Sequence, residues 1–230
     1  MPTTYAAITM ALADSGLVAR GGAVAVPGEE LPDGVEGRPA AAVVLVGNVG
    51  GAMWAAFSAA RRAEPHPLDA WARRVLDPVA AALDARAVYP SDRPWLPFQR
   101  WAQRAEAVAP SPIGLLIHPE HGLWHAYRGA LLLAAVPPDL PRRGEHPSPC
   151  ATCADRPCLS ACPVGAHSAA GFAVDACTRH LVSAEERCIA GGCRSRDACP
   201  VGRASRFPDA QVRFHMAAFR EAREAPDRGA

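Results

Sequence analysis

The 230-residue chain contains no lysine, so all 24 of its basic residues are arginines. This absence excludes a lysine Schiff base and a lysine-containing phosphate-binding loop as parts of any mechanism. No apolar run approaches the roughly 20 residues that cross a membrane. Residues 1–10 also lack the positively charged start of a secretory signal. We therefore expect a cytoplasmic protein with no membrane partner.

Excess charge is also absent, since the formal net charge is only +1. A protein built mainly to grip nucleic acid usually carries a strong basic excess. We therefore expect no nucleic-acid partner. Half of the residues are hydrophobic and 20% are charged, which is enough to bury a core and excludes a wholly disordered chain.

Cysteine is missing from the first 149 residues, and all eight cysteines lie between positions 150 and 199. A proline-rich stretch at 137–149 separates the two parts. This shift in composition predicts a domain over 1–143, a cysteine-rich domain over 144–208, and a C-terminal helix and tail over 209–230. Disulfides are rare in the cytoplasm, so the cysteines are candidate metal ligands.

The cysteines form two groups that end in the same motif. The first group is Cys150-x2-Cys153-x4-Cys158-x3-Cys162, and the second is Cys177-x10-Cys188-x4-Cys193-x5-Cys199. Ala-Cys-Pro-Val-Gly occurs at 161–165 and again at 198–202. Two groups of four cysteines that each end in Cys-Pro are typical of a ferredoxin module with two [4Fe–4S] clusters.

In such modules the cysteine before the proline ligates the cluster of the other group. The sequence therefore predicts two sets of ligands. Site 1 is Cys150, Cys153, Cys158 and Cys199, and site 2 is Cys162, Cys177, Cys188 and Cys193. Four thiolates also suit structural zinc, which is the alternative, although a duplicated Cys-Pro is not a feature of zinc sites.

The hydrophobic patterning predicts a mixed helix and sheet domain before the cysteines. Helices are expected over 5–14, 52–62, 68–83 and 97–107, and strands over 18–26, 41–46, 85–89, 113–117 and 124–136. A last amphipathic helix is expected over 210–225.

The segment 113–133 carries Gly114-x-x-Ile117-His118-Pro119, then Gly122 and Trp124, then Arg128-Gly129 and an apolar run. Over about residues 66–143 the chain resembles the CblC-type family of cyanocobalamin decyanases and dealkylases. The resemblance implies that cobalamin binds base-off in the N-terminal domain. It assigns the corrinoid contacts to Gly114, His118, Gly122, Trp124 and Arg128.

The order of the cysteines, four, then one, then three, resembles that of a second family, the epoxyqueuosine reductases. This resemblance implies an α+β chain in which a nitroreductase-like α/β sandwich precedes a small ferredoxin-like domain with two [4Fe–4S] clusters. That family carries its catalytic aspartate in Asp-Ser-Ala-Pro. Here Ser91 stands at the corresponding position before Pro94, and Asp92 stands one place later.

Each corrinoid contact also has a plainer interpretation. His118 is equally well a turn histidine that bonds to the backbone, and Gly114 and Gly122 are ordinary turn glycines. Trp124 suits a core, and Arg128 suits a solvated strand edge.

The resulting hypothesis is a corrinoid and iron–sulfur oxidoreductase, in which two clusters deliver electrons from a donor protein to the corrinoid. One alternative is a ferredoxin-like electron carrier without catalysis of its own. Another is a flavin reductase, because nitroreductase-like folds commonly hold FMN.

Overall fold

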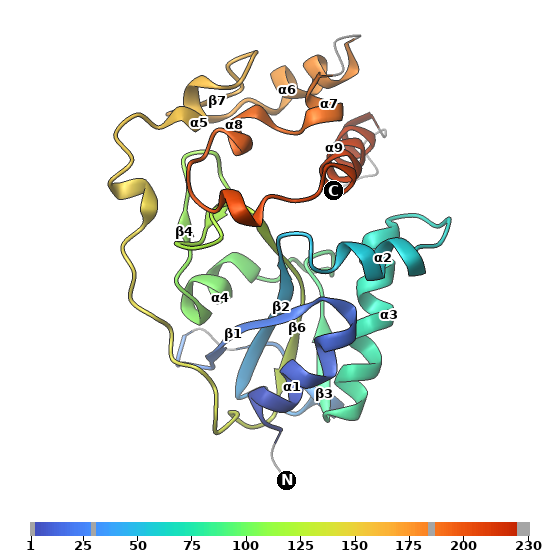
Figure 1. Ribbon diagram of the computed structural model, residues 1–230. Helices are drawn as coiled ribbons and strands as arrows, with labels where there is room; N and C mark the ends of the chain where they lie inside the picture. Colours follow the sequence, from blue (N-terminus) through green and yellow to red (C-terminus); the bar gives the residue numbers. More distant parts are fainter. Residues whose placement is uncertain (1–2, 29–30, 184–186, 225–230) are drawn as a thin grey trace. The chain divides into compact units, whose positions relative to one another are not determined.

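The computed structural model describes residues 3–28, 31–183 and 187–224. The chain divides into two compact units, each built from two stretches of sequence. Unit 1 comprises Met1–Val108 and His125–His146, and unit 2 comprises Ala109–Trp124 and Pro147–Ala230. Figure 1 shows the helices and strands of each unit. The expected mixture of helix and sheet is confirmed, whereas the nitroreductase-like and ferredoxin-like assignments stay predictions.

Unit 1 is built on a four-stranded antiparallel sheet in the order β1-β2-β6-β3. Its strands are β1 (Val18–Val24), β2 (Ala42–Val49), β3 (Ala85–Val88) and β6 (His125–Leu133). Residues 42–48 of β2 are all buried. A strand that is covered on both faces needs apolar side chains on both, which explains the unbroken apolar run seen in the sequence.

Four helices complete unit 1. They are α1 (Tyr5–Leu12), α2 (Trp54–Ala60), α3 (Pro67–Ala82) and α4 (Phe98–Ala105). Helix α3 packs on β3 and β6, whereas α4 packs on β1 and β2 (Figure 1). The side chain of Thr4 caps α1 by accepting a hydrogen bond from the Ala7 amide at 3.1 Å.

Two β-bulges in this sheet each hold an arginine. The register between β1 and β2 shifts between Ala19 and Gly22, at Arg20, and the register between β2 and β6 shifts at Arg128. Bulges re-aim side chains that regular alternation would place elsewhere. The Arg20 guanidinium makes a two-pronged ion pair with Glu106, at 2.9 Å from Nη2 to Oε2.

Unit 2 is made mostly of short elements, together with one 16-residue helix. They are β4 (Ala109–Pro110), β5 (Leu116–Ile117), α5 (Pro157–Ser160), β7 (His167–Ser168), β8 (Gly171–Phe172), α6 (Val174–Val182), α7 (Arg187–Gly191), α8 (Arg194–Asp197) and α9 (Asp209–Glu224). Helix α9 packs on α6 and α7. Arg206 pairs with both Asp197 and Asp209 at 2.7 Å and so joins α8 to the start of α9.

One segment falls on a different side of the division from that predicted. The sequence boundary near residue 143 puts 109–124 in the N-terminal domain, but the structure puts it in unit 2. The physical reason is its apolar side chains, because Ile113, Ile117 and Leu123 share a buried cluster with Cys199.

Within the described residues, no helix is both long and apolar enough to cross a membrane.

The buried ion pair of unit 1 gives a stability prediction. Arg20→Met removes the guanidinium group from the largely buried Arg20–Glu106 pair, and loss of one partner of such a pair costs about 3–5 kcal/mol of unfolding free energy. Denaturant unfolding of the full chain measures this loss. The matched control is Arg38→Met, because the Arg38–Asp84 pair is exposed (side chains 45% and 70%) and exposed pairs contribute at most about 1 kcal/mol. Equal losses in both variants would contradict the prediction.

Candidate metal centres

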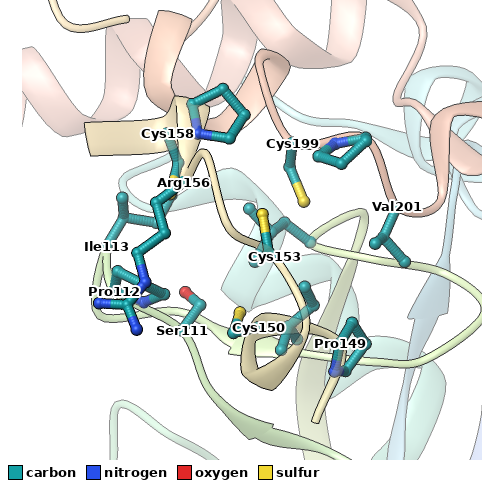
Figure 2. Close-up of a pocket in the computed structure, with 14 residues that line it drawn as sticks. Ser111, Pro112, Ile113, Pro149, Cys150, Cys153, Arg156, Cys158, Cys199 and Val201 are labelled. Carbon is teal, nitrogen blue, oxygen red and sulfur yellow. The ribbon is translucent and has the colours of Figure 1, made fainter. Parts of the chain in front are cut away.

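The four thiols that the sequence assigns to site 1 line one pocket of unit 2. Cys150 lies in a short 3-10 helix (Pro149–Ala151) and Cys153 follows it, while Cys158 lies in α5 and Cys199 follows α8. Figure 2 shows sulfur atoms from these separate segments facing the same space. The pocket contains about 400 Å³ free of atoms, which includes open solvent.

The wall of this pocket is mostly apolar. It is formed by Ile113, Ile117, Leu123, Val201 and the prolines at 112, 149, 157 and 200. Burial raises the pKa of the Cys158 thiol, and the neighbouring Cys199 and Cys153 raise it further. Burial likewise raises the pKa of Cys150, although a hydrogen bond with Ser148 partly lowers it. Four thiolates in such a place need a cation, and a bound metal would deprotonate them.

The four thiols assigned to site 2 are grouped around Cys177, which lies in α6. Burial raises the pKa of Cys177 to about 11, and Cys193, Cys162 and Cys188 each raise it further by like charge. Cys188 lies in α7, and Cys193 directly precedes α8. Ligation itself stays a prediction for both sites.

Polar groups contact three of the sulfur atoms in site 2. The Ala166 amide donates to Cys162 Sγ at 3.2 Å. His180 Nε2 lies 3.5 Å from Cys188 Sγ, and His167 Nε2 lies 3.9 Å from Cys193 Sγ. Neither histidine was predicted from the sequence as a site residue. His167 is 26 positions from its cysteine, and that separation gives no local pattern to detect.

In the ranges that the structure describes, no three His, Cys, Asp or Glu side chains converge as a site for a metal ion. The thiols of site 1 instead line the wall of a shared space.

Close backbone packing holds the second Cys-Pro motif in place. His118 and Gly122 close a turn through reciprocal backbone hydrogen bonds of 2.9 Å. A Cβ added to Gly122 would lie 2.0 Å from the Val201 carbonyl oxygen, and one added to Gly202 would lie 2.2 Å from His121. The turn 118–122 therefore packs directly on the segment that follows Cys199, and only glycine permits that approach.

His118 is held inside the same turn. Its Nδ1 accepts hydrogen bonds from the Glu120 amide at 3.1 Å and the His121 amide at 3.2 Å. Its ring stacks on that of His121 with the centroids 4.5 Å apart. These contacts match the plainer interpretation of His118 as a turn residue.

Trp124 is buried, with only 4% of its surface exposed. It packs edge-on against Phe207 at 5.5 Å and shares a small core with Val212. The Arg196 guanidinium lies over its ring at 4.5 Å and donates to the Leu123 carbonyl oxygen. Trp124 thus joins the segment 109–124 to the rest of unit 2.

The remaining two predicted corrinoid contacts differ from these. Gly114 is exposed, with φ of +79° and nothing within 4 Å of a Cβ built on it. Arg128 belongs to unit 1, where its Nε donates to the buried Asn48 at 3.1 Å. Burial lowers the pKa of Arg128 to about 10, against the opposing charge of Asp69. The structure therefore puts four of the five residues in unit 2 and the fifth in unit 1.

Comparison with known proteins relates the chain to solved structures alone, because no protein-family model and no curated protein matches it. A selenomethionine-labelled epoxyqueuosine reductase matches with a TM-score of 0.54 at 15% identity, over 90% of this chain and 67% of that one. Epoxyqueuosine reductase from Streptococcus thermophilus matches with a TM-score of 0.52 at 15% identity, over 87% and 66%. The chain thus spans about two thirds of their length.

These matches show a shared fold. They support the resemblance to epoxyqueuosine reductase, which the order of the cysteines had suggested. The resemblance to the CblC-type family finds no support in them.

The expectation that the chain has no nucleic-acid partner is contradicted. One of the matched structures is an epoxyqueuosine reductase with a tRNA-Tyr epoxyqueuosine-modified tRNA stem loop, at 16% identity and a TM-score of 0.48. That expectation rested on the net charge, and a total of +1 does not describe how charge is distributed over the surface.

The two turn glycines give a matched test of what Gly122 does. Gly122→Ala places a methyl group against the Val201 carbonyl and displaces the segment after Cys199, so the variant should bind about half the iron of the parent chain and unfold at a lower temperature. Gly114→Ala meets open space and should cost only about 1–2 kcal/mol of backbone strain. Iron analysis and thermal unfolding distinguish the two variants. Full iron binding by Gly122→Ala would show that the close packing is dispensable.

Proposed function

We propose that the chain is an iron–sulfur oxidoreductase that holds two [4Fe–4S] clusters, one at site 1 and one at site 2. The observation that carries the proposal is the pocket shared by Cys150, Cys153, Cys158 and the distant Cys199. Crossed ligation of this kind accounts for the repeated Ala-Cys-Pro-Val-Gly motif.

Bound clusters supply single electrons at low potential. The residues of unit 2 provide the thiolates and control their surroundings. Ile113, Ile117 and Leu123 line site 1 with apolar surface, and the surroundings of a cluster are one of the factors that set its potential. His167, His180 and the Ala166 amide direct polar contacts to the sulfur atoms of site 2.

The matched solved structures support a reductive role, since they are described as reductases. An electron-donor protein is needed to supply the clusters, and the chain passes these electrons to an acceptor. Two acceptors deserve direct comparison: a corrinoid, which the sequence resemblance implies, and an epoxyqueuosine-modified tRNA stem loop, which one matched structure contains.

Binding of a corrinoid stays a prediction. His118, Gly122 and Trp124 also make packing contacts within unit 2. The test must therefore observe the corrinoid itself.

The first experiment purifies the full chain without oxygen and reconstitutes it with iron and sulfide. Two reducible [4Fe–4S] signals in electron paramagnetic resonance (EPR) spectra are expected. Tight zinc binding with no iron–sulfur signal would overturn the proposal. The reduced protein is then offered cob(II)alamin or the modified stem loop. A base-off spectrum identifies corrinoid binding, reduction of the bound cob(II)alamin to cob(I)alamin identifies a corrinoid acceptor, and loss of the epoxide identifies an RNA acceptor. Oxidation by neither would leave an electron carrier and contradict the enzymatic part.

Cysteine variants test the crossed ligand sets. Cys199→Ser should remove the same EPR signal as Cys153→Ser, because both belong to site 1, while Cys162→Ser should remove the other signal. If each cluster instead took four consecutive cysteines, Cys162→Ser would match Cys153→Ser. The ligand sets are therefore assigned by finding which variant, Cys199→Ser or Cys162→Ser, loses the same EPR signal as Cys153→Ser.

A further inference from the structure

Ser111 carries a hydroxyl group that its own turn does not use. The Ser111 amide donates to the Leu115 carbonyl at 2.8 Å, and its carbonyl accepts from the Gly114 amide at 3.0 Å. These backbone bonds close the turn between β4 and β5. The hydroxyl oxygen is buried and has no hydrogen-bond partner among the residues that the structure describes.

The hydroxyl lies at the wall of the site 1 pocket. Ser111 lines this pocket together with Cys150, Cys153, Cys158 and Cys199. Figure 2 shows its oxygen among the side chains that line the pocket, between those of Arg156 and Cys150 in this view. The neighbouring wall is formed by Pro112, Ile113 and Ile117, whose apolar side chains accept no hydrogen bond.

A buried hydroxyl without a partner costs free energy, and native structures rarely leave one unsatisfied. A cluster bound in the pocket would supply the missing acceptor, because its sulfide atoms and the thiolates that hold it accept hydrogen bonds. Arg156 also lines the pocket, but it is exposed, so its charge is screened by water.

We propose that the Ser111 hydroxyl donates a hydrogen bond to a sulfur atom of the cluster held at site 1 and raises the reduction potential of that cluster. The inference rests on the proposed function. Reduction adds negative charge to the cluster, so a donor to its sulfur atoms stabilises the reduced state more than the oxidised state. Ser111 tunes the potential of the cluster through this hydrogen bond and is not a ligand.

The test is an EPR-monitored redox titration of the reconstituted full chain. Ser111→Ala should leave both clusters loaded and make site 1 about tenfold harder to reduce, which is about 59 mV for a one-electron couple. Site 2 should titrate as before. Ser111→Thr keeps the hydroxyl and should restore the parent value. Ser160→Ala is the control, because the Ser160 hydroxyl is exposed and donates to the Pro157 carbonyl.

A direct observation of the proton completes the experiment. Electron–nuclear double resonance of the reduced parent chain should detect a proton that couples to the site 1 cluster and exchanges in D2O, and this proton should be missing from Ser111→Ala. If that variant fails to load, Ser111→Cys retains a weaker donor and should shift the potential in the same direction by less. Unchanged potentials with both clusters loaded would overturn the role of Ser111 alone. A parent chain without clusters would overturn the proposed function.

Discussion

The close packing of two glycine-containing turns is the constraint on which site 1 depends. Gly122 meets the Val201 carbonyl and Gly202 meets His121 at distances that leave no room for a side chain. This contact fixes the segment after Cys199 against the turn 118–122. Because Ile113, Ile117 and Leu123 belong to the same stretch of chain, the wall of the pocket and its most distant thiol are set together. The spacing of the cysteines alone does not achieve this.

Unit 1 contains a different feature, two arginines placed at bulges of its sheet. Its sheet places β2 between β1 and β6, and a bulge on each neighbouring strand redirects an arginine. Arg20 is compensated by Glu106, which also accepts a hydrogen bond from Tyr127; burial, followed by the charge of Glu106, raises the pKa of Tyr127. Arg128 has a buried amide, Asn48, at its Nε. Burial of two cations in one small sheet gives unit 1 a polar interior that hydrophobic patterning does not reveal.

The sequence predicted those features that depend on residues close together along the chain. Helix 68–83 and strand 41–46 were located to within a few residues, because periodicity and apolar runs are local signals. The four thiols that the spacing of the cysteines assigned to site 1 line one pocket, while ligation by them stays a prediction. Long-range packing could not be read in this way. The segment 109–124 joins the cysteine-rich unit through contacts with residues some 80 positions away, and Trp124, predicted as a ligand contact, also packs on Phe207 and Val212. Net charge also misled, because it carries no spatial information.

Native mass spectrometry of the intact chain under anaerobic conditions tests the central claim most directly, because it counts iron and sulfide on each molecule. The account predicts a mass increase equal to two [4Fe–4S] clusters, lost in two steps on mild oxidation. A mass increase equal to two zinc ions, or no bound inorganic sulfide after reconstitution, would contradict it.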